Sequence, residues 1–157
     1  MSNQDERPAR LPPERSLLER EGGTQAVFSR QLVALLLDTD LFFSVKVTDT
    51  LKHAGYTTKT FRRPEDFAAA LVSENPALAL VNTGARGVDW RSGIAAAVVA
   101  SVPVVAFGSH VDLATQQEAR DLGATSVIAN SKLASDLPGV VARALKRTHQ
   151  HQEKHEE

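Results

Sequence analysis

The sequence predicts an α/β fold, a doubly wound five-stranded parallel sheet with helices on both faces. Short apolar or β-branched runs alternate five times with segments whose apolar residues recur every three or four positions. Wholly apolar runs of this length suit strands that are buried on both faces, as in a parallel sheet. The helical segments between them supply the right-handed crossovers that parallel strands need. The 157 residues, 42% of them hydrophobic, suffice for one domain with a sizeable core.

The five expected strands differ in composition. The first, third, fourth and fifth are apolar, whereas the second is β-branched and aromatic, as strands with a half-exposed surface often are. Pro103 is tolerated because it lies near the start of the fourth run. The expected strands are 32–37, 56–61, 77–81, 102–107 and 126–129.

Five helices are expected between and after these strands. They are 41–53, 67–74, a third capped by Asp89 or Ser92 that runs to Ala100, 112–122 and 133–146. Gly55 and Gly123 follow the first and fourth at the position where glycine commonly ends a helix. The side chains expected to face the sheet include Phe43, Val47, Leu51 and Ala54 in the first helix and Phe67, Leu71 and Val72 in the second.

The rest of the chain is expected to flank this domain. Residues 1–31 are predicted to form a flexible N-terminal extension, in which 12–23 is either a short helix or a solvated tail. The predicted domain covers 32–147, and 148–157 is predicted to be a charged C-terminal tail. The histidines of that tail lack a carboxylate cage, so no metal site is expected there.

Bulk composition excludes several classes of protein. The net charge of −1 provides no basic field for nucleic acid or for an anionic membrane. No apolar run approaches the roughly 20 residues of a membrane helix. The absence of cysteine excludes disulfides and thiolate chemistry, and a reducing cytoplasm is the predicted location. No nucleophile–base set is evident, so we expect neither an enzyme nor a cofactor.

Polar residues gather where the expected strands end. Asp38, Thr39 and Asp40 follow the first strand, Asn82 the third, Gly108 and Ser109 the fourth, and Asn130 the fifth. The carboxyl ends of parallel strands share one edge of a sheet, and ligands of open α/β sheets bind in the crevice there. The sequence therefore predicts one crevice that contains these residues.

Several blocks resemble the receiver domain of bacterial response regulators. The resemblance covers about 32–147 and rests on 78–82 followed by 87–89, on 102–108, and on Gly55-Tyr56 and Gly123-Ala124 before the second and fifth strands. It implies the flavodoxin-like strand order 2-1-3-4-5. It also implies two acidic positions after the first strand, a phosphoacceptor aspartate after the third, a hydroxyl after the fourth and a lysine after the fifth.

This chain departs from that pattern at most of these positions. Asn82 lies at the phosphoacceptor position, Thr39 at the second acidic position, Gly108 at the hydroxyl position and Asn130 at the lysine position. A shift of register would place Ser109 or Lys132 there instead, but none restores an aspartate at 82. Apart from any such role, Asp38 and Asp40 could cap the first helix, and Asn82 and Asn130 could cap loops.

These departures predict a degenerate receiver, or pseudo-receiver. We expect a stand-alone, phosphorylation-independent protein–protein interaction module in bacterial signal transduction, without bound metal. Its partners would be signalling proteins, or a second copy bound through the last two helices. The alternative is a sensor that binds a nucleotide or another small polar ligand in the crevice near Asp38, Asn82, Ser109 and Asn130.

Overall fold

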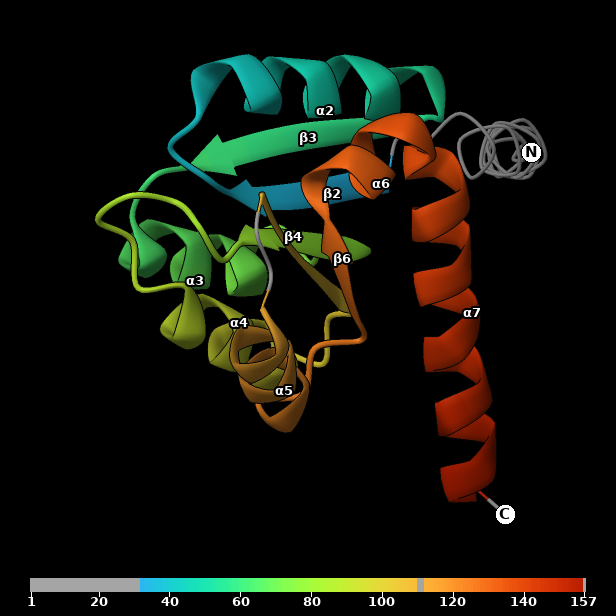
Figure 1. The fold of residues 1–157 in the computed structure, drawn as a ribbon. Helices are drawn as coiled ribbons and strands as arrows, with labels where there is room; N and C mark the ends of the chain where they lie inside the picture. The colour runs from blue at the N-terminus through green and yellow to red at the C-terminus, as the bar shows by residue number, and fades with distance from the viewer. Residues whose placement is uncertain (1–31, 110–111, 157) are drawn as a thin grey trace, which may run out of the picture. The chain divides into compact units, whose positions relative to one another are not determined.

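The computed structural model describes residues 32–109 and 112–156, with side chains described as far as residue 147. The predicted extension 1–31 lies outside this range. Five parallel strands form one sheet in the order β3-β2-β4-β5-β6, which is the predicted 2-1-3-4-5 (Figure 1). The elements are β2 (Leu32–Leu37), α2 (Leu41–His53), β3 (Tyr56–Phe61), α3 (Pro64–Ser73), β4 (Leu78–Asn82), α4 (Trp90–Val99), β5 (Val104–Gly108), α5 (Leu113–Asp121), β6 (Ser126–Ala129), α6 (Asn130–Ser135) and α7 (Leu137–Glu156).

The central strands are buried because helices cover both faces of the sheet. β2 pairs in parallel with β3 and β4, and β5 lies between β4 and β6. Every residue of β4 and β5 is buried. Leu35 and Leu80 have no exposed surface, so their predicted burial is confirmed.

Each face of the sheet has its own hydrophobic core. One core packs α2, α6 and α7 against side chains such as Leu36, Leu80 and Phe107. The other packs α3, α4 and α5 against the alternate residues of the same strands, including Leu37 and Ala106. Figure 1 shows the same division, with α2 on one side of the sheet and α3 and α4 on the other. The period of two along a strand therefore divides one sheet between two cores.

Three of the helices begin at an aspartate cap. Asp40 accepts a hydrogen bond from the Phe43 backbone N–H at 3.1 Å and caps α2. Asp89 and Asp112 cap α4 and α5 in the same way. α3 instead begins with Pro64, three residues before the expected start, because proline suits the first turn of a helix. The interpretation of Asp40 as a helix cap is thus confirmed.

Helices α2 to α5 all end in the same way. In each, the second residue after the helix adopts a left-handed conformation, with φ of 92° at Gly55, 49° at Asn75, 61° at Ser101 and 109° at Gly123. This is the usual C′ position of a helix, which glycine fills most easily. The next strand starts within five residues, so all four turns lie at the edge of the sheet where the strands begin.

The C-terminal helix differs from the expected 133–146. α6 ends at Ser135, and α7 begins at Leu137 and continues to Glu156, through most of the expected tail. Asp136 separates the two helices with φ −146° and ψ 47°. Pro138 accounts for the break, because its ring clashes with the preceding turn and it has no N–H to donate.

Two side chains expected to face the sheet do not. Val72 is 80% exposed because it lies about 100° around α3 from the buried Leu71. Ala54 is exposed because it follows the last turn of α2.

Within the described residues, no helix is both long and apolar enough to cross a bilayer.

Candidate functional site

A cavity of about 240 Å³ lies at the edge of the sheet where the strands end. It is lined by Asp38, Thr39, Asp40, Asn82, Gly84, Ala85, Arg86, Ser109 and Asn130. We call it the crevice. It brings together all the residues proposed for the strand ends except Gly108, which is buried as the last residue of β5. Of the two candidates for the hydroxyl position, only Ser109 lines the crevice.

The Asp38 carboxylate lies at the centre of this arrangement. It is only 1% exposed and follows directly after β2. Its Oδ1 accepts two hydrogen bonds, from Asn82 Nδ2 at 2.8 Å and from the Asp40 backbone N–H at 3.0 Å. Its Oδ2 is also buried and has no hydrogen-bond partner in the described part of the chain.

Both ends of the Asn82 amide are hydrogen-bonded. The Nδ2 donates to Asp38, and the Oδ1 accepts from the Gly84 backbone N–H at 2.7 Å. This arrangement fixes the orientation of the amide, because the opposite orientation would point its carbonyl oxygen at a carboxylate and its NH₂ at another donor. The interpretation of Asn82 as a loop cap is therefore confirmed by its bond to the Gly84 N–H. In addition, the Asn82 Nδ2 donates a hydrogen bond to Asp38.

Burial raises the pKa of the Asp38 carboxyl above its ordinary value of 3.8. The hydrogen bonds from the Asp40 N–H and the Asn82 amide oppose that shift because they stabilise the charged form, but the effect of burial is larger. The folded protein therefore holds the Asp38 proton more tightly than the unfolded chain does. Ionised Asp38 must lower the free energy of unfolding as the pH rises from 3.8 through the raised pKa.

We expect Asp38→Asn to reveal this dependence. The variant keeps the volume of the side chain and removes its charge, so its stability relative to wild type should improve from acidic to neutral pH. Denaturant unfolding across that pH range measures the difference. Asp49→Asn, at an exposed position of α2, is the control. Parallel profiles for the two variants would contradict the assignment of the shift to Asp38.

The remaining lining residues are mostly neutral. Thr39 is half-buried and Ser109 is exposed. Asn130 begins α6, and its Oδ1 is buried without a hydrogen-bond partner in the described residues. Arg86, in the loop after β4, is exposed and is the one cation among the lining residues that the structure describes.

The crevice does not suit Mg²⁺, the metal that the receiver resemblance implies. Magnesium takes hard oxygen ligands in octahedral geometry, usually with at least one or two carboxylates. Here the Asp40 carboxylate is already engaged as the cap of α2. Asn82 lies where the metal would require an anionic ligand, and its NH₂ group donates to Asp38 instead. No group of three or more His, Cys, Asp or Glu residues in the described segments is placed to hold a metal ion.

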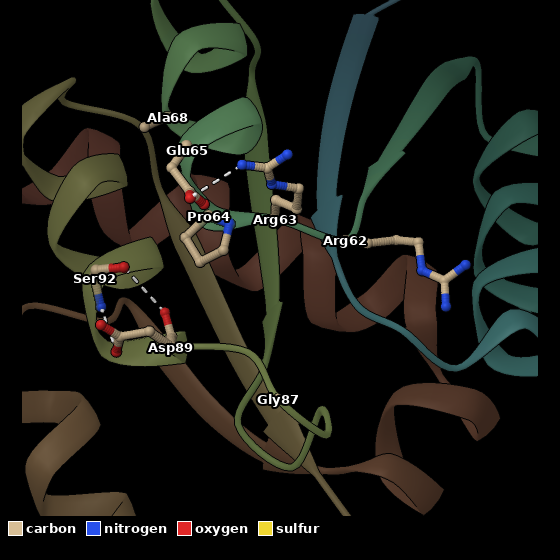
Figure 2. Close-up of a pocket in the computed structure, with 8 residues that line it drawn as sticks. All are labelled: Arg62, Arg63, Pro64, Glu65, Ala68, Gly87, Asp89 and Ser92. Atoms are coloured by element: carbon tan, nitrogen blue, oxygen red, sulfur yellow. Dashed lines mark hydrogen bonds and ion pairs between the residues drawn. The ribbon is translucent and has the colours of Figure 1, made fainter.

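A second, larger cavity of about 570 Å³ was not expected from the sequence. It lies between the first turns of α3 and α4 and is lined by Arg62, Arg63, Pro64, Glu65, Ala68, Gly87, Asp89 and Ser92 (Figure 2). Arg63 pairs with Glu65 at 3.4 Å, and the Asp89 carboxylate accepts from the Ser92 N–H. Figure 2 shows Arg62 extending away from Asp89 and Ser92. Most polar side chains here are therefore already engaged with one another.

Sequence reasoning also missed Arg86 and the backbone at Gly84 and Ala85 as parts of the crevice. The available signal was their position, directly after the third strand in a loop that contains two glycines. Sequence alone does not indicate which residues of such a loop turn back toward the sheet.

No protein-family model matches the chain, and no curated protein matches it in sequence. Solved structures do match its fold. A CheY-like response regulator receiver domain protein from Methanospirillum hungatei JF-1 aligns with a TM-score of 0.69 and 15% identity, over 77% of this chain and 98% of that one. The signal receiver domain of a modulated diguanylate cyclase from Desulfovibrio desulfuricans G20 gives 0.68 and 19%, over 77% and 98%.

NtrX from Brucella abortus, a longer protein, aligns with a TM-score of 0.70 and 22% identity, over 80% of this chain and 29% of NtrX. At such identities the likeness concerns the fold. Together with the observed strand order, these comparisons show that the described sheet and its helices have the receiver fold.

Proposed function

We propose that this chain is a pseudo-receiver, a protein–protein interaction module of bacterial signal transduction that works without aspartyl phosphorylation. Its receiver fold supports a role in signalling, because the solved structures that it resembles include response regulator and signal receiver domains. The hydrogen bond between Asn82 and Asp38 supports independence from phosphorylation. That contact is the observation on which the proposal chiefly rests.

Asn82 lacks the chemistry of a phosphoacceptor. A carboxylate attacks phosphorus through an anionic oxygen and forms an acyl phosphate, whereas an amide oxygen is neutral and a poor nucleophile. In this protein that oxygen also accepts the Gly84 N–H, and the amide nitrogen donates to Asp38. The side chain thus stabilises the loop after β4 and the end of β2.

The surroundings would not stabilise a transferring phosphoryl group either. Such transfers depend on fixed cations and donors directed at the developing negative charge. Asn130 is neutral where the family pattern has a lysine, so it supplies no positive charge to offset that of phosphate oxygens. Gly108 has no hydroxyl. These features support an interaction role that does not require phosphoryl transfer in the crevice.

The proposed partners are signalling proteins or a second copy of the chain. The last two helices of the sequence prediction correspond to α5 and to the α6–α7 pair. Around this face, Arg147 bonds the Thr125 carbonyl and the Ser126 hydroxyl, and Arg143 pairs with Asp136. The two Arg147 contacts connect α7 to β6, the short strand at the edge of the sheet, whereas the Arg143–Asp136 pair lies at the start of α7.

Phosphodonor treatment tests the proposal directly. We expect wild type to gain no phosphate mass from acetyl phosphate with Mg²⁺ by intact-protein mass spectrometry, whereas a receiver with its aspartate intact should be labelled. Asn82→Asp alone should restore little labelling, because Thr39, Gly108 and Asn130 remain. An acid-labile phosphate on Asp38 or Asp40 of wild type would overturn the proposal.

The crevice also favours one version of the alternative function, ligand sensing. Its unpartnered buried atoms, Asp38 Oδ2 and Asn130 Oδ1, are both hydrogen-bond acceptors. A nucleotide would bring phosphate oxygens, which are acceptors too, toward a carboxylate. The arrangement therefore favours a ligand that donates hydrogen bonds over a nucleotide.

A further inference from the structure

Two residues that line the crevice, Asp38 and Asn130, each have a buried oxygen that no described residue satisfies. Asp38 Oδ2 belongs to a carboxylate that is 1% exposed, and Asn130 Oδ1 belongs to the first residue of α6. Both residues line the same 240 Å³ cavity. Buried polar atoms are nearly always hydrogen-bonded, and leaving one unpaired destabilises the fold, more so when the atom is charged. Two unpaired acceptors in one cavity point to a ligand that donates.

We propose that the crevice binds a small organic cation with at least two N–H donors, of the primary ammonium or guanidinium class. One N–H would bond Asp38 Oδ2, and another Asn130 Oδ1. This inference goes beyond the proposed interaction role and does not depend on it.

Charge selects for a cation over a neutral donor. The lining residues include two carboxylates, Asp38 and Asp40, and one cation, Arg86. Asp40 is engaged as the cap of α2, so its charge is partly offset by the helix N-terminus. The donors to Asp38 among the described residues are neutral, namely the Asn82 amide and the backbone at Thr39 and Asp40. No described residue forms an ion pair with Asp38. A buried carboxylate without an ion-pair partner is costly, and a bound cation relieves that cost.

Size and geometry limit the ligand further. Pockets for drug-sized molecules usually measure about 300–1,000 Å³, so 240 Å³ suits a metabolite of fewer atoms. A cation without N–H groups would satisfy the charge and leave both oxygens unpaired. A metal ion would meet the Asn82 NH₂, which points at the same carboxylate.

Arg86 provides a test with the opposite sign. Its guanidinium is exposed, lies on the loop after β4, and has no ion-pair partner among the described residues. Its positive charge at the mouth of the crevice opposes an incoming cation. Arg86→Gln should therefore strengthen binding, whereas Asp38→Asn should weaken it.

The experiment titrates ¹⁵N-labelled full-length protein with four probes: methylguanidinium, ethylammonium, tetramethylammonium and Mg²⁺. The readouts are the amide shifts of Asp40 and Gly84 and the side-chain NH₂ signals of Asn82 and Asn130. Methylguanidinium and ethylammonium should shift these signals saturably. Tetramethylammonium, which has the charge without N–H donors, should not.

Among the variants, we expect Asp38→Asn to weaken methylguanidinium binding at least tenfold and Arg86→Gln to strengthen it several-fold. Should Asp38→Asn fold poorly, Asn130→Ala serves instead and should weaken binding by removing one acceptor. Equal binding of tetramethylammonium, tighter binding of Mg²⁺, no saturable shift with any probe, or unchanged affinity in both Asp38→Asn and Asn130→Ala would each overturn the proposal. Apart from Mg²⁺ binding, none of these results bears on whether the protein is phosphorylated. The proposal of cation binding can therefore fail while the proposal of a phosphorylation-independent role stands.

Discussion

Replacing Asn82 with aspartate is expected to lower the free energy of unfolding by about 3 kcal/mol at neutral pH. The change removes the 2.8 Å hydrogen bond to buried Asp38 and places a second carboxylate against the first. Because like charges raise the pKa of one member of the pair, the loss should diminish as the pH falls and that carboxyl takes up a proton. Denaturant unfolding at several pH values measures both effects.

Gln117→Glu is the matched control. Gln117 Nε2 donates to Asp121 Oδ1, also at 2.8 Å, but this pair is exposed on α5. The same change from amide to carboxylate should cost only about 0.5 kcal/mol there. Similar losses in the two variants would show that the burial of Asp38 does not govern the effect.

Thr39→Asp combined with Asn82→Asp should regain part of its stability in millimolar Mg²⁺, whereas wild type should respond little.

Phe107→Ala is expected to cost about 4 kcal/mol in the free energy of unfolding. Phe107 lies in β5 with no exposed surface, and its ring packs against Phe43 of α2 with centroids 5.2 Å apart. Truncation would leave a cavity between the sheet and α2 that neighbouring side chains fill only in part. Thermal or denaturant unfolding measures the loss.

Phe42→Ala is the control for this core prediction. Phe42 precedes Phe43 in α2 but is 92% exposed, so its removal should change stability by less than about 0.5 kcal/mol. A large loss for Phe42→Ala would indicate that this ring packs against another part of the protein or a second copy. A small loss for Phe107→Ala would show that the core on the α2 face contributes little.

The sheet could be predicted because its strands are buried on both faces. Runs such as Leu78–Asn82 have no polar side chain before their last residue, and their alternation with helical segments fixes a parallel topology. Three strands have the predicted limits, and the limits of the other two, β4 and β5, shift by one or two residues. β5, for example, starts at Val104, after Pro103, which has no N–H to add to the ladder.

The break at Asp136 was missed although its signal was present. Pro138 and Gly139 lie within an apolar pattern that continues from Leu133 to Leu145, and the period alone favoured one helix. Proline at this position ends one helix and suits the first turn of the next. Here a local steric rule outweighs the hydrophobic period.

The members of the crevice could be predicted, but its hydrogen bonds could not. Residues that follow parallel strands must share one edge, which placed Asp38 and Asn82 together from sequence. The bond between them joins side chains 44 positions apart and depends on their rotamers, which no local pattern specifies. The same limit applies to the unpartnered oxygens of Asp38 and Asn130 and to Arg86.

The four left-handed turns that follow α2 to α5 affect the stability of the fold at positions remote from the crevice. They lie at the edge of the sheet opposite the crevice, and two of them, at Asn75 and Ser101, bear side chains where glycine would be relaxed. A residue with a side chain in that conformation costs about 1 kcal/mol, less for asparagine, and the cost can be removed without touching Asp38 or Asn82. The stability of the fold can thus be changed at one edge of the sheet without altering the side chains of the proposed binding crevice at the opposite edge.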